Sequence, residues 1–157
     1  MLFKTIKMEE SKKLLSLIDA VAKWGLYTNP AETALEELRR SLAELYAFCV
    51  NIHYDFDEEY YPDSPDTDYN AIRQTITVNF PDFGYYYVLS TFNPNENPEL
   101  YMGDAIDDLA DIISDLLETK WRYEHNGETD ALWFLELSFV SHFEQHIIDL
   151  LHYIRNT

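Results

Sequence analysis

The side chains best suited to chemistry are histidines and aspartates in the C-terminal half. His142, His146 and Asp149 follow an H-x3-H-x2-D spacing, which places all three on one stripe of a helix. Two histidines four residues apart form a recurrent metal-chelating pair. If the preceding helix ran antiparallel to this one, His142 would lie level with Asp111 and His146 with Asp107. The sequence therefore permits a metal site of Asp107, Asp111, His142 and His146, in a metal-binding helical bundle or enzyme.

The pattern of the preceding helix argues against that site. Its aspartates lie opposite the apolar residues by which it should pack, so they should point away from His142 and His146. Hydrogen bonds between histidine and aspartate at the edge of the bundle are the preferred interpretation, and such pairs raise a histidine pKa. The chain has no Ser-His-Asp neighbourhood, no CxxC and no glycine-rich phosphate loop. We therefore predict a non-enzymatic protein without a cofactor.

That preceding helix is predicted over residues 103–125 and has a nearly pure carboxylate face. Acidic residues occupy one stripe, at Asp104, Asp107, Asp108, Asp111, Asp115 and Glu118. Apolar residues occupy the other side, at Ile106, Leu109, Ile112, Ile113, Leu116 and Leu117. Like charges four residues apart cost roughly 0.2–0.5 kcal/mol each, and aspartate is a poor helix former. The stripe is either a solvated face or a surface for a basic partner, and we favour the partner.

The remaining pattern predicts an all-α fold, a single compact domain built as an antiparallel bundle of about five helices. The main helices are expected at 8–27, 31–52, 69–80, 103–125 and 129–154. The apolar run after residue 80, FGYYYVLSTF, is ambiguous between a strand and an irregular helix. Because one isolated strand would have no partner, we expect a helix at 69–80 followed by a tight aromatic turn.

An acidic, tyrosine-rich loop is predicted between the second and third helices, at Tyr54–Asp68. Its Phe56, Tyr60 and Tyr61 are unusual in a purely solvated segment. They either pack down onto the domain or anchor a partner, since aromatic residues ringed by charge are typical of interface hot spots.

Composition narrows the class of partner. The 157 residues carry a formal net charge of −18, and the stretch from Asp55 to Asp115 holds fifteen acidic residues and one basic residue, Arg73. Such a field repels nucleic acid and anionic membranes and attracts basic proteins. No signal peptide and no membrane span are recognisable, so a cytoplasmic protein is expected. The single cysteine, Cys49, lies in an apolar run and is predicted to be a buried core residue.

The C-terminal half carries two recognisable pieces. The first contains Leu109-Ala110-Asp111-Ile112 and Asp115-Leu116, and the second contains Ala131-Leu132-Trp133, Phe139, His142, His146 and Leu150 to His152. Together they resemble the bacterial domain-of-unknown-function family 5063, whose members carry LADIYxDLK and ALW…F…H…ALxxLH patterns. Ile113 departs from that pattern, because an aromatic residue is usual there. The resemblance covers residues 85–153 and implies a compact helical protein, without implying an activity.

These observations lead to a functional hypothesis based on charge and size. We expect an acidic protein-binding domain, an immunity or inhibitor protein that neutralises a basic bacterial toxin such as a nuclease by electrostatic capture. The expected contact residues are Asp57, Glu58, Glu59, Tyr60, Tyr61, Asp63, Asp66, Asp104, Asp107, Asp108, Asp111 and Asp115. The alternatives are the metal site above and a domain whose acidity serves only solubility. The sequence leaves the oligomeric state open.

Overall fold

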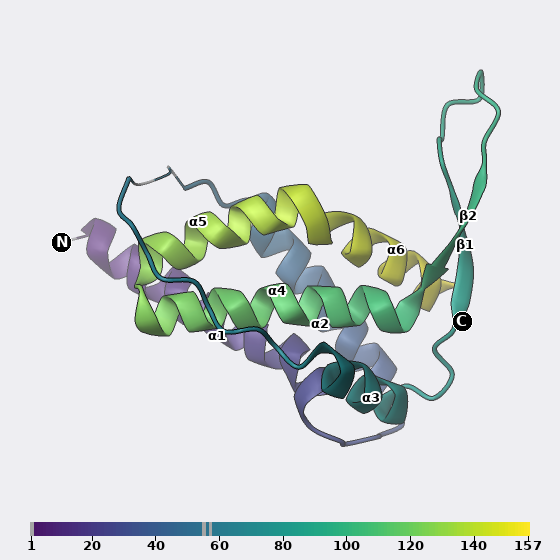
Figure 1. Ribbon diagram of the computed structural model, residues 1–157, viewed down its shortest axis with the longest axis horizontal. Helices are drawn as coiled ribbons and strands as arrows, with labels where there is room; N and C mark the ends of the chain where they lie inside the picture. Colours follow the sequence, from purple (N-terminus) through teal and green to yellow (C-terminus); the bar gives the residue numbers. More distant parts are fainter. Residues whose placement is uncertain (1, 55, 57) are drawn as a thin grey trace.

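The computed structural model describes residues 2–54, 56 and 58–157. The predicted all-α fold is confirmed, with one two-stranded hairpin added to the helices. In chain order the elements are α1 (Leu2–Leu26), α2 (Ala34–Val50), α3 (Tyr69–Asn79), β1 (Tyr85–Leu89), β2 (Leu100–Asp104), α4 (Ala105–His125), α5 (Glu128–Ser138), the π-helix η1 (Phe139–Phe143) and α6 (Glu144–Arg155). In Figure 1, α5 and α6 return antiparallel to α4, and the hairpin projects from one end of the bundle.

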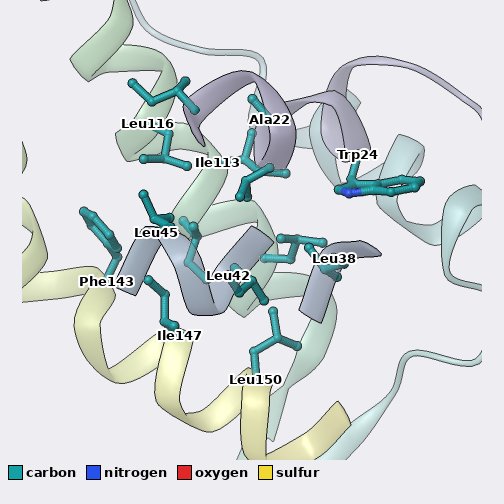
Figure 2. Packing of buried hydrophobic residues seen from close by; sticks show 14 of the residues in the cluster. Ala22, Trp24, Leu38, Leu42, Leu45, Ile113, Leu116, Phe143, Ile147 and Leu150 are labelled. Carbon is teal, nitrogen blue, oxygen red and sulfur yellow. The ribbon is translucent and has the colours of Figure 1, made fainter. Parts of the chain in front are cut away.

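The core lies where α1, α2, α4 and α6 face one another, as Figure 2 shows. Ile113 of α4 and Leu42 of α2 are fully buried there, together with Phe143 of η1. Burying a side chain of this size contributes about 1.5–3 kcal/mol. Cys49 is also buried, as predicted, and burial raises the pKa of its thiol to about 12.

Local signals define the beginning and end of α4. Asp104 is the N-cap, and its Oδ1 accepts a hydrogen bond from the backbone N–H of Ile106 at 2.9 Å. The helix ends at His125, and Gly127 follows with a φ of 105°, a conformation that favours glycine. Gly127 also separates α4 from α5, which lets the chain turn back along α4. The predicted helix at 103–125 is therefore correct except for its first two residues, which belong to β2.

The prediction of a tight aromatic turn after residue 80 is wrong, because Tyr85–Leu89 is a strand. It pairs antiparallel with Leu100–Asp104, and Tyr87 lies opposite Met102. A strand here was not expected because no partner was recognised. The partner lies beyond the polar NPNENP segment, which forms the hairpin loop. Two apolar runs flanking such a turn segment are a hairpin signal. The helix predicted at 69–80 is confirmed as α3.

The single helix predicted at 129–154 is divided by η1. The backbone N–H of Glu144 bonds to the carbonyl of Phe139, five residues earlier, which is the hydrogen-bond pattern of a π-helix. The wider turn accommodates one extra residue while Phe139 and Phe143 both stay buried. It also sets the direction in which His142 leaves the backbone.

Candidate functional site

The acidic side of α4 does not form an outward stripe along its whole length, which corrects the sequence prediction. Asp108 is buried, and Asp111 and Asp115 are partly buried. The reason is that α4 contacts α1, α3, α5 and α6. Because neighbours pack on several sides of α4, they cover part of its polar side as well as its apolar stripe.

Two histidines from the C-terminal segment meet these aspartates. Asp108 Oδ1 accepts a hydrogen bond from His146 Nδ1 at 2.8 Å, and Asp115 Oδ2 accepts one from His142 Nδ1 at 2.7 Å. His146 Nε2 lies 3.4 Å from Asp111 Oδ2. The predicted histidine–aspartate hydrogen bonds are therefore confirmed, and the expectation that the carboxylates point away from the histidines is wrong.

The pairing differs from the predicted heights. His142 lies beside Asp115 rather than level with Asp111 alone, and His146 lies beside Asp108 and Asp111 rather than Asp107. The structure thus brings Asp111, His142 and His146 together, and leaves out the fourth predicted ligand, Asp107.

Asp107 instead forms an ion pair with Arg73 of α3. The same guanidinium lies 3.7 Å from Asp104 Oδ2. Arg73 is the only basic residue in the acidic stretch from Asp55 to Asp115. It therefore offsets part of the charge at the start of the predicted stripe, and Asp108, Asp111 and Asp115 lie nearer the histidines.

Two tyrosines complete this cluster, and the sequence analysis did not identify their role. Tyr69 donates a hydrogen bond to Asp111 Oδ1 at 2.9 Å, and Tyr86 donates one to Asp108 Oδ2. Burial and these carboxylates raise the pKa of both phenols, so both stay protonated as donors. The ring of Tyr86 lies over Gly103 and occupies the space that a Cβ there would need. Only the pairing of β1 with β2 brings that ring into position.

The protonation of the cluster depends on its buried charges. The hydrogen bond to Asp108 raises the pKa of His146, although burial opposes the shift. Burial raises the pKa of Asp115, and the hydrogen bond from His142 opposes that shift. Burial likewise raises the pKa of Asp149, which is beside His146. All three groups bind a proton more tightly in the folded chain than in the unfolded chain.

This arrangement predicts that His146 stabilises the fold more at low pH. Because the pKa of His146 is higher in the folded chain than in the unfolded chain, protonation of His146 stabilises the fold. This contribution is complete below the pKa in the unfolded chain, near 6.5, and is lost as the pH rises through the pKa in the folded chain. We expect the free energy of unfolding of the wild type to exceed that of His146→Gln by more at about pH 6 than at about pH 9. Urea unfolding at each pH measures this difference, with His152→Gln as the matched control. A difference that stays constant over this range would contradict the prediction.

The acidic loop lies across α4 before it reaches α3 (Figure 1). Its predicted contact residues divide into exposed and packed side chains. Glu58, Glu59, Tyr60, Asp63 and Asp66 are exposed, while Tyr61 is partly buried and Asp57 lies outside the described residues. Phe56 contacts the ring of Trp133, with 5.1 Å between centroids, and still remains exposed. The loop therefore keeps an acidic outer surface and anchors itself partly through its aromatic residues.

The hairpin exposes several large apolar side chains. Its exposed side chains include Tyr87 at 74%, Met102 at 66% and Phe92 at 87%. Opposed residues of an antiparallel pair share a face, so Tyr85, Tyr87, Leu89, Leu100 and Met102 lie on one side of the hairpin. In the sequence the run FGYYYVLSTF was ambiguous between strand and helix, and the β2 half of this face was not identified. The apolar run Leu100-Tyr101-Met102 was the available signal.

No helix among the described residues is long and apolar enough to cross a membrane. A search of curated proteins found no match, and a search of solved structures found none. The family model described as Domain of unknown function (DUF5063) matches residues 6–156. The match extends well beyond the 85–153 segment in which the resemblance was visible, and includes α1, α2 and α3. The chain therefore belongs to the DUF5063 family of domains of unknown function.

Proposed function

We propose that this chain is a non-enzymatic protein-binding domain that captures a basic protein partner, and that the apolar face of its hairpin is the central contact. The observation that carries this proposal is the exposure of Tyr85, Tyr87, Leu89, Leu100 and Met102 on one side of a projecting hairpin. Contiguous apolar surfaces of this kind mark interaction sites in otherwise polar proteins. Tyrosine in particular is enriched among residues that dominate binding energy.

Charge supports a basic partner. No lysine or arginine lies between Arg73 and Lys120, a segment that contains the whole hairpin. Asp104 is at the base of the apolar face, and Glu96 and Glu99 are exposed near the loop of the hairpin. A second copy of this chain would bring another net charge of −18 to the same surface. Repulsion therefore disfavours self-association and favours a positively charged protein.

The acidic loop extends this field along α4. Glu58, Asp63 and Asp66 are exposed there, and such charges outside the apolar centre raise the rate of association with an oppositely charged partner. Neutralisation of a basic toxin by an immunity or inhibitor protein is the specific function we propose within this class. Its support is the charge and the size of the chain, since no motif identifies a toxin.

The experiment uses basic proteins encoded next to the gene of this chain as defined probes. Calorimetric titration is expected to detect a one-to-one complex with one of them. Truncating two opposed anchors in Tyr87→Ser plus Met102→Ser should weaken binding at least tenfold, because hot-spot truncations cost about 2 kcal/mol or more each. The charge reversals Glu58→Lys plus Asp66→Lys should mainly slow association, an effect that high salt reproduces.

Val140→Ser is the matched control, because Val140 is an exposed apolar residue of η1 and does not belong to the hairpin. Unchanged binding by the folded Tyr87→Ser plus Met102→Ser variant would contradict the proposed surface. A dimer of the chain that the same variant dissociates would assign the hairpin to self-association instead. If the bound neighbour stops growth when expressed alone, restored growth on co-expression would support neutralisation, and continued arrest would count against it.

A further inference from the structure

The cluster between α4 and the C-terminal segment has a second property that is independent of the proposed protein partner. One possible ligand atom from each of Asp111, His142 and His146 lies within 4.8 Å of the other two. We propose that these three residues bind a divalent transition-metal ion, represented here by Zn²⁺, through two imidazole nitrogens and one carboxylate oxygen. Two histidines and one carboxylate are an established donor set for such ions.

The spacing of two of the ligand atoms already fits. His146 Nε2 lies 3.4 Å from Asp111 Oδ2. Two ligands held about 2.0–2.1 Å from a tetrahedral Zn²⁺ are separated by about 3.3–3.4 Å. The third ligand is half exposed, since the His142 side chain has 48% of its surface accessible. One ligand atom of His142 lies within 4.8 Å of the other two, and rotation of this exposed side chain can bring it closer to them.

The hydrogen bonds around the ligands orient them for this role. Metal-binding histidines typically donate their other ring N–H to a carboxylate. His146 donates Nδ1–H to Asp108 at 2.8 Å, which directs Nε2 toward Asp111, and His142 Nδ1 is paired with Asp115 at 2.7 Å. Tyr69 occupies Asp111 Oδ1 at 2.9 Å, so Oδ2 is the oxygen that faces His146. Each of the three ligands is thus held by a neighbouring side chain.

The backbone beneath the cluster supports the same assignment. His142 belongs to the π-helix, and π-helical turns occur frequently at functional sites. Phe143 next to it is fully buried and fixes that turn in the core. His142 and His146 therefore leave a rigid segment on the side that faces α4, and their ring centroids are 5.1 Å apart.

Charge balance gives a cation a reason to bind there. Arg73 pairs with Asp104 and Asp107, so it does not compensate the carboxylates farther along α4. Asp108, Asp111 and Asp115 then face two histidines. A dication offsets two of these three negative charges while both imidazoles remain uncharged. The part-exposed side chains of all three ligands leave room for water at the remaining coordination positions.

The test measures metal binding by the full chain alone after chelator treatment, at about pH 8, above the ordinary pKa of histidine. Zn²⁺ titrated in a calorimeter is expected to bind with one-to-one stoichiometry, and Co²⁺ should give the visible absorption of a site with nitrogen ligands. His142→Ala, His146→Ala and Asp111→Asn should each weaken Zn²⁺ binding by at least 100-fold. Asp108→Asn, which removes a supporting contact, should weaken it by about 10–100-fold.

Two variants serve as matched controls. His152→Ala removes an exposed histidine of the same helix, and Asp107→Asn removes a carboxylate of α4 that pairs with Arg73. Both should bind Zn²⁺ as the wild type does. Circular dichroism checks that each variant folds. If His146→Ala does not fold, His142→Ala provides the decisive comparison, because His142 is the more exposed ligand.

Two results would overturn the metal site. One is the lack of saturable binding of Zn²⁺ and Co²⁺ by the wild type, and the other is unchanged binding in folded His142→Ala and Asp111→Asn. The hairpin variant Tyr87→Ser plus Met102→Ser should retain metal binding, because neither residue belongs to the cluster. Failure of the partner proposal and failure of the metal proposal are therefore measured on different variants with different probes.

Discussion

Replacing Asp130 with alanine is expected to lower the free energy of unfolding by about 3 kcal/mol. Asp130 has a side chain that is only 3% exposed, and its two oxygens accept hydrogen bonds from Arg122 Nη1 at 3.2 and 3.1 Å. It also accepts one from Asn126 Nδ2 at 2.7 Å, which ties the end of α4 to the start of α5. Removing the carboxylate leaves a largely buried guanidinium with less compensation. The effect stays at the lower end of the usual range because Glu118 still pairs with Arg122.

Asp63→Ala is the matched control for this prediction. Asp63 faces the same guanidinium at 3.9 Å, but its side chain is 95% exposed. Exposed ion pairs contribute about 0–1 kcal/mol, so its loss should be nearly silent. Urea unfolding followed by circular dichroism measures both variants. Equal stability of Asp130→Ala and Asp63→Ala would mean that burial does not determine the strength of this interaction.

The second large effect is expected from Phe143→Ala, which should destabilise the fold by about 3–5 kcal/mol. Phe143 is fully buried and contacts Phe139 edge to face at 5.4 Å between ring centroids. In Figure 2 its side chain points into the core beside Leu45 and Ile147. Removing the ring leaves a cavity that rigid helices on every side cannot fill. A melting temperature lower by roughly 6–20 °C is expected for a domain of this size.

Val140→Ala controls for changes to the π-helix itself. Val140 lies in the same five-residue turn but is 69% exposed, so its truncation should change stability by no more than about 0.5 kcal/mol. Differential scanning calorimetry compares the two variants. If Val140→Ala were as destabilising as Phe143→Ala, the backbone of the turn would determine stability, and the buried ring would not.

Much of the helical architecture could be predicted from local patterns. Apolar residues at helical spacing predicted α2, α3 and α4, and the predicted end of α4 at residue 125 is correct. The same spacing placed Cys49 on a buried face. These features depend on residues within a few positions of one another, so periodicity and capping chemistry are sufficient to predict them.

The hairpin could not be derived in the same way. Tyr87 pairs with Met102 across a polar loop, and each run alone is too short for its periodicity to distinguish strand from helix. Strand formation there depends on a partner outside the local window. Considering the two apolar runs together, rather than separately, would have predicted the pairing and with it the exposed apolar face.

The charge and helical class of this protein are determined by its sequence alone, and so are the histidine pair and the aspartates that could serve it. Only the tertiary structure decided that Asp108, Asp111 and Asp115 face His142 and His146, while Asp107 faces Arg73. The physical reason is that helical periodicity gives the angle between side chains on one helix. It does not give the number of neighbours around that helix, or which of its aspartates lie beside the histidines of the segment opposite.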